Sequence, residues 1–160
     1  AADRGFVHYV RALRAMRRKE FDLSRDEFDK ALELDPTNAQ YTFDLGLMSF
    51  ENKDFNAAIR DFTAAMELDP SDADFPYNRG LAWHWKRKFD RAIADYSLTL
   101  QIKPDHSYAN RNRGLVVVSN EVVHAFWHDA ADWSGHVNAA VWSFAIVDVE
   151  PPFEVSVSGF

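Results

Sequence analysis

The feature that most constrains this chain is a 34-residue repeat that extends from Leu34 to Pro104. Three prolines and three glycines recur at this interval: Pro36, Pro70 and Pro104, and Gly46, Gly80 and Gly114. Self-similarity at a fixed period indicates a repeat architecture, in which no unit buries its apolar face alone and stacked units share a core.

Each unit is predicted to contain two amphipathic helices, A and B, joined by a tight turn. In the second unit the apolar residues recur at three- and four-residue intervals, which is helical periodicity. They are Tyr41, Leu45, Leu47 and Met48 in helix A, and Ala58, Ile59, Phe62, Ala65 and Met66 in helix B, which should begin at Asp54-Phe55. The closing proline cannot continue a helix and therefore ends each unit.

The repeated glycines fall inside helix A, where glycine costs roughly 1 kcal/mol relative to alanine. Their recurrence predicts a position where two helices approach closely. Ala58 and Ala92 supply the matching small side chains on helix B.

This pattern resembles the tetratricopeptide repeat, a helix-turn-helix unit of the same length. The matching residues are Leu45, Gly46, Ala58, Phe62, Ala65 and Pro70 in one unit, and Gly80, Trp83, Ala92, Tyr96 and Pro104 in the next. Ser49, Arg79 and Thr99 depart from the pattern. The resemblance implies an all-α fold, a right-handed superhelical solenoid of helix-turn-helix units with a divergent C-terminal cap.

The predicted array covers residues 4–118, with units at about 5–38, 39–72 and 73–106 and a half unit at 107–118. The first unit has a basic stripe, formed by Arg11, Arg14, Arg17, Arg18 and Lys19. A solvated helix face at the open end of the array explains this stripe, and an acidic partner is the alternative.

The charge balance gives no support to a nucleic-acid partner. The net charge is −7, and all 18 Lys and Arg residues precede Gly114, together with 19 acidic residues. Binding to a phosphate backbone needs clustered basic side chains instead.

Without cysteine the chain forms no disulfide. We predict no membrane span, because the longest apolar stretch, Val137–Val147, is too short. No signal peptide is visible, which favours a cytoplasmic location. The chain starts at Ala1 rather than at a methionine, and three explanations stay open: trimming, removal of a leader, and excision from a longer chain.

The resemblance implies a concave groove, lined by the A helices, that binds a peptide or protein segment. By this carry-over the groove residues are Tyr9, Leu13, Phe43, Asp44, Leu47, Phe50, Tyr77, Asn78, Leu81, His84, Trp85, Arg111 and Asn112. Asn78 and Asn112 look like two rungs of the asparagine ladder of sugar-transferase members, whose amides contact a peptide backbone. The alternative is that they cap or bridge helices.

The chaperone-binding members of the family use a clamp of Lys, Asn and Arg, which is not present as a set. At the positions that correspond to the clamp, this chain has Tyr9, Leu13, Phe43, Leu47, Tyr77 and Leu81. An aromatic groove flanked by Arg111 suits a partly apolar peptide. Trp83 and Trp85 are two residues apart and cannot face the same way, so we assign Trp83 to the core and Trp85 to the groove or surface. The alternative is that these aromatic residues fill gaps between helices.

Residues 119–160 depart from the repeat and are predicted to form a divergent helix and an apolar tail. Ser119 or Asn120 could cap a helix that runs to about Trp133, with Gly135 as its stop. Beyond Gly114 there are six acidic residues and no Lys or Arg, and the tail contains Trp127, Trp133, Trp142 and Phe144. So many apolar groups must pack on the array or pair with another chain, which makes self-assembly into a homo-oligomer the second functional hypothesis.

A zinc site in the tail is the weakest hypothesis. His124, His128, Asp132 and His136 are spaced by four, which places neighbours on one helix face. Gly135 would end the helix before His136, and no glutamate base lies between the first two histidines. No phosphate-binding glycine loop or nucleophile elbow is present, so we predict a non-enzymatic protein without a metal or cofactor.

Overall fold

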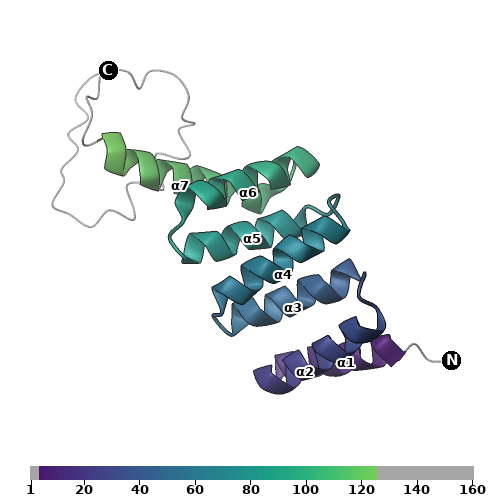
Figure 1. Ribbon diagram of the computed structural model, residues 1–160. Coiled ribbons are helices and arrows are strands. Elements are labelled where there is room, and N and C mark those ends of the chain that lie inside the picture. The colour runs from purple at the N-terminus through teal and green to yellow at the C-terminus, as the bar shows by residue number, and fades with distance from the viewer. Residues whose placement is uncertain (1–3, 126–160) are drawn as a thin grey trace.

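The computed structural model describes the backbone of residues 4–125 and the side chains of residues 4–116. This part of the chain forms seven helices and no β-strand: α1 (Arg4–Arg17), α2 (Phe21–Leu34), α3 (Ala39–Glu51), α4 (Phe55–Leu68), α5 (Asp74–Trp85), α6 (Phe89–Ile102) and α7 (Ser107–Ala125). The A helices are α1, α3, α5 and α7, and the B helices are α2, α4 and α6. Successive A–B pairs stack in chain order, which makes an all-α helical repeat solenoid (Figure 1).

Each unit has its own hydrophobic cluster, centred on one aromatic residue of the B helix. Phe28, Phe62 and Tyr96 occupy this place at the repeat interval, and each is 0% exposed. In the first unit, Phe28 is joined by Leu45 and Met48 of α3, so neighbouring units share a core. This sharing is what the repeat period predicts, because a single helix pair cannot bury its apolar face.

The predicted close approach is present in the second and third units, but its partner is the aromatic residue rather than the alanine of the B helix. A Cβ atom built on Gly46 would lie 2.7 Å from the ring of Phe62, and one built on Gly80 would lie 2.8 Å from the ring of Tyr96. Glycine is therefore required because the ring occupies the space of a side chain.

The turn between the A and B helices has the same conformation in every unit. Lys19, Lys53 and Arg87 adopt left-handed φ angles of 60°, 62° and 58°. In the second unit, the Lys53 N–H donates to the Phe50 carbonyl and the Asp54 N–H donates to the Ser49 carbonyl. These two bonds form a Schellman motif, which ends the A helix. The Asp54 side chain then accepts a bond from the Ala57 N–H and caps α4. The helix begins at Phe55, which agrees with the predicted start of helix B at Asp54-Phe55.

The expected start of a separate helix at Ser119 or Asn120 is wrong, because α7 continues from Ser107 to Ala125 without a break. The apolar residues after Gly114 extend the A helix of the fourth unit. The predicted apolar tail beyond Ala125 lies outside the described residues. No helix in the described part of the chain is long and apolar enough to cross a membrane.

Candidate peptide-binding site

A pocket of about 480 Å³ lies where the end of α5, the start of α6 and α7 meet. It is lined by Leu81, His84, Trp85, Arg87, Phe89 and Asn112, and we call it the Trp85 pocket. The first three residues come from the last turns of α5, and Asn112 comes from the next A helix. Four of the six lining residues belong to the groove predicted from the sequence.

Trp85 is the largest exposed apolar group at this pocket, with 65% of its surface accessible. Its indole is nearly parallel to the ring of Phe55, at a centroid distance of 6.0 Å and an interplanar angle of 8°. Phe55 is in turn packed edge-on by Phe50. This stack holds the indole in place although most of it faces solvent. Trp83, by contrast, is half-buried in the core cluster of the third unit, as expected.

The polar groups of the pocket are oriented by neighbouring aromatic residues. His84 packs edge-on against Phe89, with centroids 5.7 Å apart. Partial desolvation lowers the pKa of His84 below its ordinary value, so the imidazole is neutral at pH 7. The Asn112 amide donates to the Tyr77 hydroxyl at 3.2 Å and thereby links α7 to α5.

The other predicted groove residues do not form one continuous exposed surface. Tyr9, Leu13, Leu47, Phe50, Tyr77 and Asn78 are half-buried, and Arg111 is exposed. The prediction that Phe43 and Asp44 line the groove is wrong, because these residues are only 8% and 7% exposed and cannot line an open groove. The Phe43 ring is enclosed by Phe62 and Phe75.

Two predicted groove residues instead connect the first unit to the second. The Tyr9 hydroxyl donates to the Asp44 carboxylate at 2.6 Å, and the Tyr9 ring stacks on Tyr41 at 4.4 Å. Burial and the adjacent Asp44 carboxylate raise the pKa of Tyr9. Asp44 also accepts a bond from Gln40.

The two asparagines have partners within the protein. Asn78 donates to the Asp74 carbonyl in its own helix at 2.8 Å, while Asn112 bridges two helices. The Asn112 bond matches the alternative stated above, in which the asparagines cap or bridge helices, whereas the Asn78 bond stays within α5.

Sequence reasoning missed Arg87 and Phe89 as lining residues, and Phe55 as the support of Trp85. These residues lie in the A–B turn or at the start of a B helix, whereas the groove implied by the family resemblance is lined only by A helices. A signal was present, since Phe21, Phe55 and Phe89 recur at the repeat interval, each two residues after Lys19, Lys53 or Arg87.

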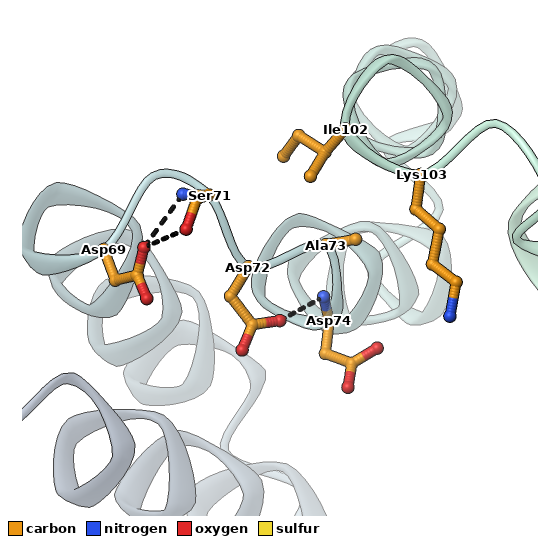
Figure 2. A pocket seen from close by; sticks show the side chains of 7 residues that line it. All are labelled: Asp69, Ser71, Asp72, Ala73, Asp74, Ile102 and Lys103. Atoms are coloured by element: carbon orange, nitrogen blue, oxygen red, sulfur yellow. Dashed lines mark hydrogen bonds between the residues drawn. The ribbon is translucent and has the colours of Figure 1, made fainter.

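A second hollow of about 450 Å³ lies on the loop between α4 and α5, near the end of α6. Three carboxylates and one amine line it, and its residues are Asp69, Ser71, Asp72, Ala73, Asp74, Ile102 and Lys103 (Figure 2). Asp69 accepts bonds from the N–H and the hydroxyl of Ser71, and these bonds lower its pKa. Asp72 accepts a bond from the Asp74 N–H at the start of α5. The carboxylates thus shape the loop, and the hollow has the opposite charge to the Trp85 pocket.

A buried acidic residue recurs on each B helix: Glu27, Asp61 and Asp95, which are 8%, 8% and 4% exposed. Glu27 is bonded to His8 and Lys30, which lower its pKa. Asp95 accepts two bonds from the Arg79 guanidinium, at 2.8 and 2.7 Å. Asp61 has a longer ion pair, at 3.4 Å, with the exposed side chain of Arg60. Each carboxylate therefore has a different electrostatic environment.

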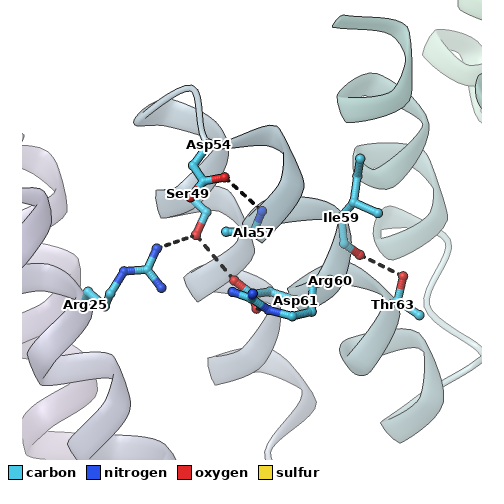
Figure 3. Close-up of polar contacts among 8 residues, drawn as sticks. All are labelled: Arg25, Ser49, Asp54, Ala57, Ile59, Arg60, Asp61 and Thr63. Atoms are coloured by element: carbon cyan, nitrogen blue, oxygen red, sulfur yellow. Dashed lines mark hydrogen bonds and ion pairs between the residues drawn. The ribbon is translucent and has the colours of Figure 1, made fainter. Parts of the chain in front are cut away.

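The contacts of Asp61 are visible in Figure 3. Its oxygens lie 3.3 Å from the Ser49 hydroxyl and 3.4 Å from Nε of the exposed Arg60. Ser49 also accepts a bond from Arg25 of the preceding unit. Desolvation outweighs these contacts and raises the pKa of Asp61. The bonds of Ser49 to Asp61 and of Arg25 to Ser49 join neighbouring helices, whereas the contact with Arg60 lies within α4.

Within the part of the chain that the structure describes, no cluster of three or more His, Asp or Glu side chains is arranged to hold a metal ion. The predicted histidine set at 124, 128 and 136, with Asp132, lies outside the described side chains.

Solved structures similar to this chain are repeat domains of the same architecture. The first TPR of Spaghetti (RPAP3), bound to the HSP90 peptide SRMEEVD, matches with a TM-score of 0.70 and 21% identity over 76% of this chain and 96% of that chain. MamA matches with a TM-score of 0.70 and 25% identity over 75% of this chain and 70% of that chain. The Arabidopsis OM64 TPR domain matches with a TM-score of 0.65 and 22% identity over 70% and 93%, respectively.

The sequence itself gives the more specific comparison. No curated protein sequence matches the chain. The family model of the tetratricopeptide repeat matches twice, over residues 9–62 and 49–107, which together cover more than half of the chain. The chain therefore belongs to the tetratricopeptide repeat family.

Proposed function

We propose that this chain is a non-enzymatic interaction module that binds a peptide or protein segment at the Trp85 pocket. Tetratricopeptide repeat domains generally mediate protein–protein interactions. One structural neighbour, the first repeat domain of RPAP3, is bound to a peptide, and this supports a peptide as the ligand class.

The observation that carries the proposal is the exposed Trp85 indole held against Phe55. An exposed aromatic ring with a fixed orientation binds a partner at low entropic cost, because little side-chain freedom remains to be lost. Tryptophan is also enriched among the residues that dominate binding energy. Among the described residues, the lining of the pocket contains no carboxylate, hydroxyl or thiol.

Selection from a random peptide library tests this function directly. The full chain is immobilised, and enriched peptides are synthesised and titrated by calorimetry. We expect dissociation constants on the order of 1 μM, which corresponds to about −8 kcal/mol. Trp85→Ala should weaken binding by about 30-fold or more, as expected for a hot-spot residue.

The matched control is Leu23→Ala, which removes an apolar group that is 50% exposed on the B helix α2. This change should leave the affinity within about twofold, because Leu23 belongs to the first unit and does not line the Trp85 pocket. The proposal fails if no peptide is enriched over bare support, or if Trp85→Ala binds the selected peptides as tightly as the original chain.

A second candidate function is self-association through the C-terminal part of the chain. It is favoured by the sequence after Gly114, which has six acidic residues, no Lys or Arg and three tryptophans. Light scattering on the full chain and on a version that ends at Ala125, the last residue of α7, tests it. A dimer or larger species that becomes a folded monomer on truncation supports this function, and a monomeric full chain rules it out at the concentration used.

A further inference from the structure

The Trp85 pocket combines an apolar floor with a single cation at its rim. Leu81, Trp85 and Phe89 provide the floor, and among the described side chains that line the pocket only Arg87 carries a full charge. The Arg87 guanidinium lies 5.9 Å from the centre of the Phe89 ring, so the positive charge is located beside the apolar surface.

Arg87 differs from the other arginine of this unit that is near the core. Arg79 is paired through two hydrogen bonds with Asp95. Among the described side chains no carboxylate forms an ion pair with Arg87, which is exposed in the turn between α5 and α6. Its backbone is fixed by the left-handed φ of 58° and by the bond from its N–H to the His84 carbonyl.

Adjacent residues reinforce the positive charge. Lys86 and Lys88 flank Arg87, and the Lys86 amine is bonded to the carbonyl oxygen of the Asn56 side chain rather than to a carboxylate. The neutral His84 contributes no charge at pH 7. The rim is therefore cationic, and it can attract a negatively charged group without displacing a partner of the array.

We propose that the ligand of the Trp85 pocket is a peptide in which a large apolar side chain, aromatic or aliphatic, is close to an acidic residue. This inference rests on the proposed function and specifies its ligand. The apolar side chain packs against Trp85 and Leu81, and the carboxylate pairs with the Arg87 guanidinium. A guanidinium binds a carboxylate with two parallel bonds, which fixes the register of the peptide as well as its affinity.

The size of the pocket agrees with this assignment. Its volume of about 480 Å³ lies within the range of ligand pockets, roughly 300–1,000 Å³. The Trp85 indole, which is stacked on Phe55, presents a flat surface, and aromatic rings prefer to pack against such a surface in offset or edge-on geometry.

The peptides enriched from the random library by the full chain provide the first test. We expect a consensus with an apolar residue and Asp or Glu within a few positions. A consensus without an acidic residue overturns this inference and leaves the proposed function standing, whereas the absence of any enriched peptide removes both.

The second test compares each selected peptide with its counterpart in which Glu is replaced by Gln. The original chain should bind the Glu peptide about tenfold more tightly, as expected for a charge-assisted hydrogen bond. Arg87→Asn should bind the two peptides equally. Asparagine tolerates the left-handed conformation, so this change removes the charge without straining the turn.

Lys53→Asn is the matched control, because Lys53 has the same place and the same conformation in the turn of the second unit. It removes one positive charge away from the pocket lining, and it should retain the tenfold preference for Glu. If Arg87→Asn also retains that preference, the carboxylate is bound elsewhere and the assignment of Arg87 is wrong. Repeating the titrations at high salt should reduce the preference in the original chain and leave Arg87→Asn unaffected.

Discussion

At the residue scale, Asp61 is a carboxylate whose burial is not offset by its ion pair with the exposed Arg60. Its pKa is raised chiefly by desolvation, so the ionised side chain destabilises the folded state above that pKa. We predict that Asp61→Asn increases the free energy of unfolding at pH 7. The gain should shrink as the pH falls through the raised pKa of Asp61 towards about 3.9, the ordinary value, because the original side chain then becomes neutral as well. Urea denaturation at a series of pH values measures this.

Asp95→Asn is the matched comparison at the same register of the repeat. The Asp95 carboxylate holds the Arg79 guanidinium, which is only 21% exposed, and Arg79 also donates to Thr63 of the preceding unit. Removal of one partner from a buried ion pair costs about 3–5 kcal/mol, and the partial exposure of Arg79 places this case towards the lower end. A gain in stability from both asparagine variants would show that burial, and not pairing, controls these positions.

At the element scale, the packing of an A helix on its own B helix depends on the missing side chain of glycine. Gly46→Ala gains about 1 kcal/mol of helix propensity. The new methyl group, however, would meet a fully buried Phe62 ring that is held by Phe43. Overpacking costs about 1–3 kcal/mol, so we expect a net loss of stability in thermal denaturation.

The first unit offers the reverse experiment, because Ala12 occupies the equivalent position and is already 0% exposed beside Phe28. Ala12→Gly should lose about 1 kcal/mol through helix propensity alone. If Gly46→Ala proves as stable as the original chain, the two helices can move apart at little cost and the close contact is not a constraint.

The turns between A and B helices store strain at a basic residue. Lys53 has φ 62°, a conformation that costs an L-residue other than glycine roughly 1–2 kcal/mol. We predict that Lys53→Gly is more stable than Lys53→Ala by about 1 kcal/mol. Both variants lose the same charge near the end of α3, so the difference reports the backbone strain alone. Equal melting temperatures would mean that the turn relaxes out of this conformation.

At the scale of the whole molecule, the repeat period predicted the helices, their pairing and the family, because those features depend on patterns of apolar residues along the sequence. The period could not show that Phe43 and Asp44 are buried, since their exposure depends on how tightly one unit packs on the next. The period does mark the turn that contains Arg87, since Lys19 and Lys53 recur at the same place. It could not show that Arg87 lines the Trp85 pocket, because a turn residue acquires its neighbours only when α5, α6 and α7 are assembled.

The coupling between the first two units gives the last prediction. Tyr9 joins them through its bond to Asp44 and its stack on Tyr41, and Arg25 adds a bond to Ser49. Repeat arrays behave as units linked by nearest-neighbour interfaces, so loss of one interface should release one end before the rest unfolds. Tyr9→Phe removes a bond to a carboxylate worth about 1.5–3 kcal/mol. Hydrogen exchange should therefore become about tenfold faster or more in α1 and α2, with α5 and α6 unchanged.

Tyr9→Ala removes the stack as well and should enlarge this effect in the same two helices. Tyr108→Phe is the control, because Tyr108 is 58% exposed on α7 and removal of its hydroxyl should leave exchange unaltered throughout α1–α6. The prediction would be contradicted if Tyr9→Phe raised the hydrogen-exchange rate equally in all six helices. That result would mean that the array opens as one cooperative unit. An effect confined to α1 and α2 would assign Tyr9 to the interface between units, and it would leave the Trp85 pocket, in the third unit, intact when the first unit is released.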